Sequence, residues 1–172
     1  MALAAGIAMS SPTASASTFQ LSIQGPTVFG GNGSVAVTIT DDDLRPAGIG
    51  TRAGGFAVKG DTNGDTIVEN FTAWCIDIST YLNLPGWYEK TTSVAPLAAQ
   101  QIANIKALFD TAFSGLTLSD NTQSGAFQLA LWEIVNEDSG TFNVSSGTFK
   151  ATGAYSAFAC QRFAWQSGRS NQ

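Results

Sequence analysis

The N-terminal third of the chain alternates apolar and polar residues as half-buried β-strands do. Two runs place an apolar residue at every second position: Phe19, Leu21 and Ile23, then Val35, Val37 and Ile39. The glycine-rich residues 30–33 between the runs predict a turn. Residues 41–50, which include Pro46 and two glycines, predict a loop. This part of the chain therefore predicts strands separated by turns.

The middle of the chain predicts a hairpin and a longer strand. Residues 56–58 and 66–68 are short apolar runs on either side of an Asp- and Gly-rich turn, which indicates a hairpin. Residues 71–82 alternate between two faces. The apolar face carries Trp74, Ile76, Ile78 and Leu82, and the mixed face carries Phe71, Ala73, Cys75, Asp77 and Ser79. The mixed face is typical of a strand that another element covers.

Two helices are predicted after residue 95. Residues 96–113 place apolar side chains at helical spacing, with Ser93 as a candidate cap. A second helix, from residue 119 or 120 to about 137, is apolar nearly all round, which indicates burial on several sides. Residues 142–144 and 148–150 predict a final strand or hairpin. The expected class is a β-rich α+β fold, an antiparallel β-sandwich or barrel-like body with two adjacent α-helices.

The organisation predicted along the chain is one domain with two short flanks. Residues 1–16 resemble the remnant of a signal peptide, because an apolar run is followed by an A-x-A site at residues 14–16. A disordered Ala/Ser leader is the alternative, since no basic residue precedes Arg45. Residues 17–153 are expected to form a single globular domain. Residues 154–172 lose periodicity and are expected to be an atypical, truncated tail.

Composition limits the chemistry that the chain can perform. Charged residues make up 12% and the net charge is −5, with no basic cluster, so nucleic acid is not an expected partner. The chain has no histidine, which excludes Ser-His and Cys-His nucleophile pairs and histidine-ligated zinc. Residues 61–65 read as an Asx-rich turn rather than a calcium loop. No cofactor, metal site or transmembrane segment is expected.

Two apolar segments each contain one chemically notable side chain, Cys75 in residues 71–78 and Gln128 in residues 125–134. A buried amide needs a hydrogen-bond partner. A thiol and a carboxamide held together in a dry site can condense, with loss of ammonia, to an internal thioester. Gly125 in the same helix suggests the close approach of another backbone, such as the Cys75 strand. Asp77 is a candidate proton acceptor or amide orienter, or else bonds to nearby backbone.

The two segments resemble secreted bacterial thioester domains. The resemblance covers roughly residues 54–138 and is densest at residues 74–77, WCID, and residues 127–134, FQLALWEI. Related sequences occur in exported proteins with a C-terminal Pro-Glu-Pro-type sorting segment, which this chain does not show. The resemblance implies a thioester between the Cys75 sulfur and the Gln128 acyl group, with a helical portion covering the bond. Trp132, one of the family's marks, is expected to pack rather than to participate.

The same resemblance implies a secreted or cell-surface protein that attaches covalently to amine or hydroxyl groups on a protein or polysaccharide, in adhesion or in an extracellular matrix. Such a protein is not an enzyme, because its acyl group is consumed once. A non-covalent secreted β-sandwich binding or matrix module with a structural Cys75 is the alternative, and a hydrolase is a distant third. Two further pairings of Cys75 remain open: a disulfide with Cys160, and a free buried thiol beside an amide bonded to backbone.

Overall fold

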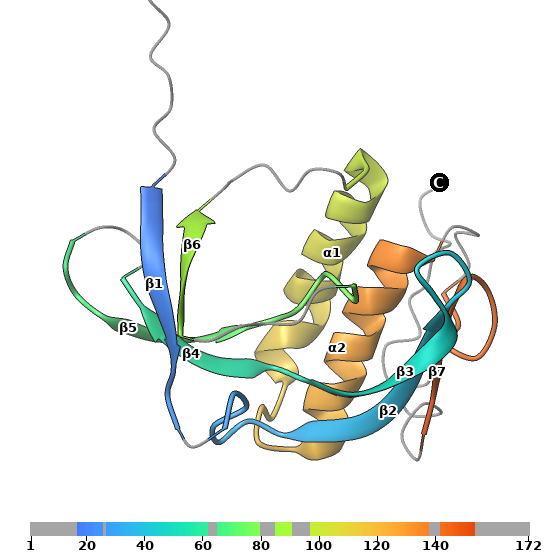
Figure 1. Cartoon of the computed structure of the whole chain (residues 1–172), viewed down its shortest axis with the longest axis horizontal. Coiled ribbons are helices and arrows are strands. Elements are labelled where there is room, and N and C mark those ends of the chain that lie inside the picture. The colour runs from blue at the N-terminus through green and yellow to red at the C-terminus, as the bar shows by residue number, and fades with distance from the viewer. Residues whose placement is uncertain are drawn as a thin grey trace, which may run out of the picture.

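The structure is a computed structural model that describes residues 17–25, 27–61, 65–79, 85–90, 97–137 and 142–153 (Figure 1). The predicted signal peptide remnant at residues 1–16 and the tail at residues 154–172, with Cys160, lie outside the described residues. The candidate cap Ser93 and the strand residue Leu82 also lie outside them.

The described strands form two antiparallel sheets. The first has the order β5-β4-β1-β6 and is made of β1 (Ser17–Ile23), β4 (Phe56–Gly60), β5 (Glu69–Ala73) and β6 (Gly86–Lys90). The second has the order β3-β2-β7 and is made of β2 (Ser34–Asp41), β3 (Arg45–Gly54) and β7 (Phe149–Thr152). Only Gly55 separates β3 from β4, so the chain runs from one sheet directly into the other. No closed barrel is found among these strands.

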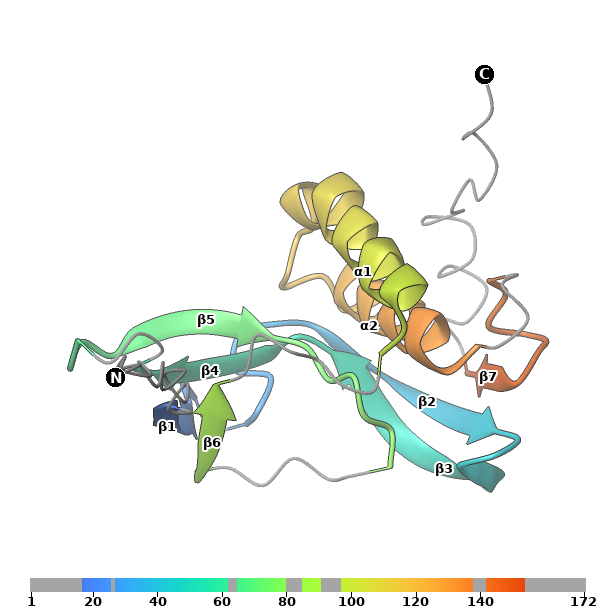
Figure 2. The same cartoon turned by 90° about the horizontal axis from the view of Figure 1, so that it is seen from above.

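Both helices lie on one side of the sheets (Figure 2). α1 spans Ala99–Ala112 and continues into the short 3₁₀ helix η1 (Phe113–Gly115), and α2 spans Asn121–Asn136. α2 packs against β2, β3 and β7 on one side and against α1 on the other. Asp120 is the N-cap of α2: its carboxylate accepts a hydrogen bond from the Gln123 N–H at 2.9 Å. The two predicted helices and the β-rich α+β class are confirmed.

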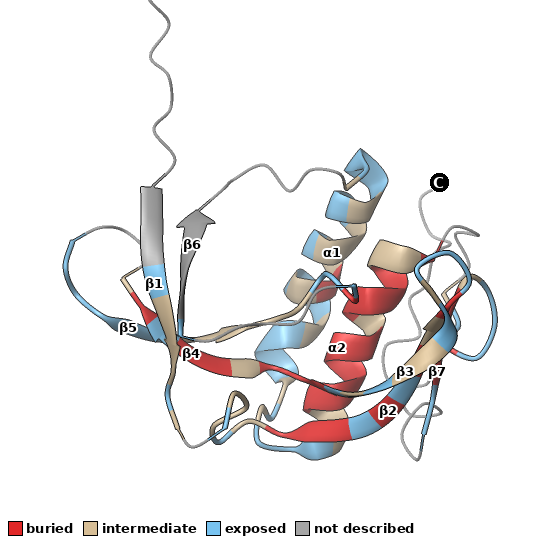
Figure 3. Ribbon diagram, viewed as in Figure 1, coloured by how far each residue is buried: buried red, intermediate tan, exposed pale blue. Residues whose placement is uncertain are grey.

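Two apolar clusters form the core, one between α2 and the sheet and one between α2 and α1. Most of α2 is buried (Figure 3). The sheet-side cluster joins Ala126, Leu129 and Trp132 of α2 to residues that include Val35, Val37, Ile39, Ala53, Phe149 and Ala151. The helix-side cluster joins Phe127, Leu131 and Ile134 of α2 to Leu108 of α1. Because α2 lies between them, its side chains are buried nearly all round, as its sequence predicts.

The loop predicted at residues 41–50 is wrong, because β3 already begins at Arg45 and only residues 42–44 form a turn. β3 is an edge strand, and an edge tolerates Pro46, whose missing N–H would disrupt an inner strand. The register between β2 and β3 is irregular from Ile39 to Asp41, and Gly48 has a positive φ of 73°. These features are typical of a bulged edge strand that sequence patterns hide.

The strand prediction around Cys75 needs two corrections. The hairpin partner of β4 is β5, with Val58 opposite Phe71, whereas Ile67 and Val68 before β5 are 63% and 62% exposed. β5 ends at Ala73, so Cys75 follows the strand rather than lying inside it. Strand alternation therefore fails here: Ile76 is exposed, although the pattern assigned it to the apolar face.

Two further strand predictions have different outcomes. The sequence pattern missed β6. Of the predicted C-terminal pair, residues 148–150 overlap β7, whereas residues 142–144 are not a strand.

Candidate functional site

A polar stripe runs along α2 between its two apolar faces. Ser124 and Gln128 lie one helical turn apart, and both side chains are buried. The Ser124 hydroxyl accepts a hydrogen bond from the Gly55 N–H at 3.0 Å, at the junction of β3 and β4. The stripe therefore faces the segments that connect the two sheets, and Gln128 faces the segment after β5.

The structure brings Cys75 and Gln128 together, 53 residues apart in the chain. The Cys75 N–H donates to Gln128 Oε1 at 3.1 Å, and Gln128 Nε2 donates to the Cys75 carbonyl oxygen at 2.7 Å. These two bonds fix which end of the amide carries oxygen and which carries nitrogen. They also satisfy an amide that is only 1% exposed, as burial of such a group requires.

The Cys75 thiol is half-buried and free in the structure. Its Sγ–H donates to the Asp77 carbonyl oxygen at 3.0 Å. Burial raises the pKa of the thiol, and interactions with the Asp77 backbone and, to a smaller extent, the Trp132 side chain act in the opposite direction. The group is therefore a neutral thiol at physiological pH, and its disulfide partner in the alternative prediction, Cys160, lies outside the described residues.

Asp77 contacts its own turn through its carboxylate. Asp77 Oδ1 accepts hydrogen bonds from the Ser79 N–H at 2.7 Å and from the Ser79 hydroxyl at 2.5 Å. Arg45 Nη2 donates to the carbonyl oxygen of the same Ser79 at 2.6 Å. This is the backbone-bonded arrangement that the sequence left open for Asp77, and its effect is to hold the shape of residues 75–79.

The residue that lies close to Gly125 is Val35 of β2, not a residue of the Cys75 segment. A Cβ on Gly125 would lie 2.4 Å from Val35 Cγ2, closer than any normal contact. The prediction of a close approach at Gly125 is confirmed, but the suggested Cys75 strand is wrong as its cause. The small residue lets α2 lie against β2, and α2 in turn positions Gln128.

We expect Gly125→Ala to destabilise the protein by about 1–3 kcal/mol, because overpacking against a stiff valine outweighs the helix propensity gained. The measurement is chemical denaturation of the variant beside Val35→Ala and the double variant. Since Val35→Ala removes the clash, the double variant should lose less stability than the sum of the two single losses. Additive losses would show that Gly125 does not set this contact.

Trp132 packs in the core, as expected, and Trp74 also packs against apolar side chains. Trp132 lies in the sheet-side cluster, against which Cys75 also packs, and Trp74 packs against Phe127 with tilted rings whose centroids are 4.5 Å apart. The indole N–H of each is buried without a hydrogen-bond partner. Trp74 and Phe127 are the residues directly before Cys75 and Gln128, so their contact helps to set the separation of the pair.

Two buried acids at the C-terminal end of α2 escaped prediction. Glu133 Oε1 accepts from the Asn143 N–H at 2.6 Å, whereas its Oε2 is buried without a partner. Burial, reinforced by the charge of Glu137, raises the pKa of Glu133 to about 7, despite the opposing Asn143 N–H. The sequence signal for them is the acidic pair at spacing i, i+4 in an apolar helix.

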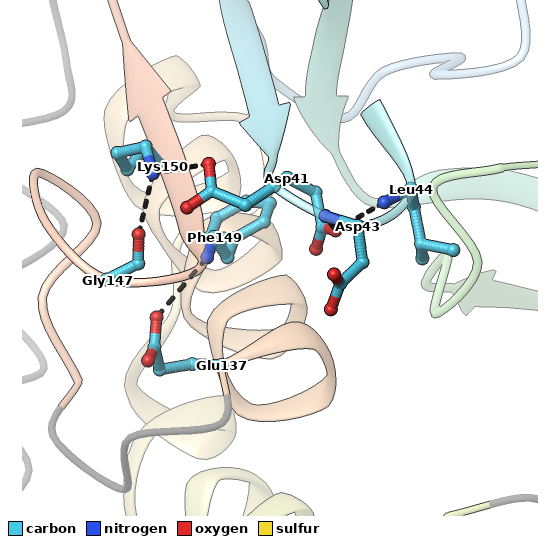
Figure 4. A network of polar contacts seen from close by, with 8 residues as sticks. Asp41, Asp43, Leu44, Glu137, Gly147, Phe149 and Lys150 are labelled. Atoms are coloured by element: carbon cyan, nitrogen blue, oxygen red, sulfur yellow. Dashed lines mark hydrogen bonds and ion pairs between the residues drawn. The ribbon is translucent and has the colours of Figure 1, made fainter. Parts of the chain in front are cut away.

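Glu137 belongs to a polar network around β7 (Figure 4). Its Oε2 accepts from the Phe149 N–H at 3.3 Å, and Lys150 forms an ion pair with Asp42 at 2.8 Å. Asp41 Oδ1 accepts from the N–H groups of residues 43 and 44 and so holds the β2–β3 turn. The network fastens β7 to α2 and β2, which is a structural role.

No protein-family model, curated protein or solved structure matches the chain. Within the described residues, no three metal-ligating side chains are grouped in a way that could hold a metal ion. No helix in that part of the chain is long and apolar enough to cross a bilayer. The candidate chemistry therefore depends on the contacts of Cys75 and Gln128 themselves.

Proposed function

We propose that this protein carries an internal thioester between Cys75 and Gln128 and uses it to attach covalently to amine or hydroxyl groups on a target. The observation that supports the proposal most is the pair of hydrogen bonds between the Gln128 amide and the backbone of Cys75. They hold the carboxamide beside the only thiol in the described part of the chain, in a site where the amide is shielded from water.

Thioester formation needs no group from outside the pair. The Cys75 sulfur adds to Cδ of Gln128, the S–H proton passes to the amide nitrogen, the C–N bond breaks and ammonia leaves. The raised pKa of the thiol makes the sulfur a poor nucleophile at neutral pH, so fixed geometry has to supply the rate. Two bonds that immobilise the amide are the kind of constraint that does so.

The backbone of Cys75 also supplies electrostatic help. Attack at Cδ places negative charge on Oε1, to which the Cys75 N–H already donates at 3.1 Å. The Cys75 carbonyl oxygen holds the nitrogen that leaves, at 2.7 Å. The same N–H would stabilise the charge that develops on the acyl oxygen when a target amine or hydroxyl later attacks the thioester.

The exposure of the residues around the pair indicates the side from which a target arrives. Gln128 is buried in α2, whereas Cys75 is half-buried and the following residues, Ile76 and Asp77, are exposed. An incoming nucleophile therefore approaches over residues 75–77. Burial of the acyl side limits hydrolysis before a target is met.

This chemistry fits an exported protein at a cell surface or in an extracellular matrix, acting in adhesion. A thioester that reacts once cannot support repeated turnover but is suited to permanent attachment, so we do not assign an enzyme activity. A second candidate has its own support: the same hydrogen bonds give both polar atoms of the Gln128 amide a partner, as a purely structural contact would. In that case the protein is a non-covalent binding or matrix module, and Cys75 stays a thiol.

The deciding measurement is the intact mass of the purified protein before and after exposure to methylamine. The thioester predicts a mass short by one ammonia, and methylamine should then add its own mass as a glutamyl amide while one thiol becomes free. A full-length mass that methylamine does not change would exclude the thioester and favour the alternative, in which the contact between Gln128 and Cys75 is only structural. A mass short by two hydrogens, restored by a reductant, would show a Cys75–Cys160 disulfide.

Cys75→Ser is the matched control for this measurement. It retains the backbone N–H and carbonyl that hold the Gln128 amide and removes only the sulfur. It should fold normally, show the full-length mass and ignore methylamine. Gln128→Ala should also show the full-length mass, and in addition it loses the two hydrogen bonds between α2 and the backbone of Cys75. A mass deficit that persists in Cys75→Ser would exclude Cys75 as the thioester sulfur.

A further inference from the structure

The indole N–H of Trp132 is a buried donor beside the candidate site. Trp132 is 4% exposed and lies one helical turn after Gln128 on α2, in the cluster against which Cys75 packs. Its Nε1 has no partner that meets hydrogen-bond geometry, yet the indole lies near enough to Cys75 to lower the pKa of the thiol. A buried unpaired donor destabilises a folded protein, so its position next to a reactive sulfur calls for a physical reason.

We propose that Trp132 is a catalytic residue whose indole N–H stabilises the sulfur of Cys75 when that sulfur becomes anionic. The proposal rests on the proposed thioester function and assigns a residue to its second step. When a target amine attacks the acyl carbon, the C–S bond breaks and its electron pair stays on sulfur. The amine's proton then passes to the thiolate, which leaves an amide and a neutral thiol.

The protonation state of the sulfur explains why the donor is unpaired in the structure. A neutral thiol is a weak acceptor, and its own proton is engaged with the Asp77 carbonyl oxygen. A thiolate is a strong acceptor, so the Trp132 bond would strengthen as negative charge develops and would favour the transition state over the ground state. In agreement, the Trp132 side chain lowers the pKa of Cys75.

The charged groups near the sulfur act in the opposite direction or are engaged elsewhere. The Asp77 carboxylate raises the pKa of Cys75 through its negative charge. Arg45 approaches the same segment, but its guanidinium donates to the Ser79 carbonyl oxygen. α2 contributes uncharged side chains to this region: Gln128 hydrogen-bonds to the Cys75 backbone, and Trp132 belongs to the apolar cluster against which Cys75 packs. The indole is thus the side chain identified here that favours the thiolate.

The test measures the thiol itself, in a background where no thioester can form. In both Gln128→Leu and Gln128→Leu/Trp132→Phe, Cys75 remains a free thiol. Its rate of alkylation by iodoacetamide is measured as a function of pH. We expect Trp132→Phe to move the midpoint of the profile to higher pH, so that alkylation below the midpoint slows by roughly tenfold. An unchanged midpoint would overturn the proposal, even if all rates changed uniformly through altered access.

Trp74→Phe is the matched control. Trp74 also has a buried, unpaired indole N–H, but it packs in the helix-side cluster. In the Gln128→Leu background it should leave the midpoint where it was. An equal shift in both variants would show a general packing effect and would contradict a specific role of Trp132.

A second readout leaves Trp132 intact and so does not depend on how the variant folds. The sequence contains four tryptophans, so the indole N–H resonances in a ¹⁵N spectrum of Gln128→Leu are few enough to assign. The Trp132 resonance should shift with the same midpoint as alkylation, and no movement would overturn the proposal. Absence of the thioester itself is a separate result, because only the mass measurement on the unmodified chain detects it.

Discussion

Phe127→Ala is expected to lower the free energy of unfolding by about 3–5 kcal/mol. The Phe127 side chain is fully buried and contacts the rings of Trp74, Phe109 and Phe113, with centroid separations of 4.5, 5.1 and 5.9 Å. Truncation therefore removes a large apolar side chain and leaves a cavity between the helices and the Trp74 segment. Chemical denaturation followed by circular dichroism measures the loss.

The same substitution should also impair the proposed thioester, because Phe127 and Trp74 directly precede Gln128 and Cys75. Leu108→Ala is the matched control. Leu108 is equally buried in the same cluster but belongs to α1, so its loss of about 2–5 kcal/mol should spare the pair. If both variants lost the mass deficit of the thioester equally, general stability rather than the Trp74–Phe127 contact would control its formation.

The stability of the protein should fall as pH rises through the range in which Glu133 ionises. Its pKa is about 7 in the folded state against an ordinary value of 4.5, so between these values the folded chain holds a proton that the unfolded chain has released. The contribution of Glu133 is present below pH 4.5 and is lost as pH rises to about 7. The total loss is about 3 kcal/mol.

Glu133→Gln separates this effect from the other acids, since it keeps the side chain's shape and its acceptor for the Asn143 N–H. Denaturation of both proteins at several pH values between 4.5 and 8 gives the comparison. The variant should show a flatter profile and should be the more stable protein at pH 8. Parallel profiles would mean that Glu133 ionises near its ordinary pKa, for instance by admitting water to its unpaired Oε2.

The elements that were predictable from the sequence are those whose apolar pattern matches the faces they bury. Val35, Val37 and Ile39 alternate because one face of β2 meets α2, and the all-round apolar pattern of α2 reflects two clusters. β3 was not predictable, because Pro46 and the glycines suit a loop equally well and only pairing with β2 makes them an edge strand. Ile76 misled the pattern because β5 ends at Ala73.

The candidate site shows the same division. An amide in an apolar helix and a thiol after a tryptophan were visible in the sequence, because each residue is unusual for its surroundings. Their hydrogen bonds run through the backbone of Cys75, which carries no sequence signature. The burial of Glu133 has a sequence signal, the acidic pair in an apolar helix, but its unpaired Oε2 and the unpaired Trp132 N–H have none, because only the three-dimensional packing decides which polar atoms lack a partner.

The position of Gln128 on the central helix has a mechanical consequence. After transfer, the target would be bonded to α2 itself, so pulling on the target would load a helix held between two apolar clusters rather than a flexible surface segment. Transfer would also cut the cross-link between residues 75 and 128. In the chain-entropy model, such a cross-link over 53 residues is worth about 4 kcal/mol. Attachment would therefore leave a tethered protein that unfolds, and yields to force, more easily than the loaded one.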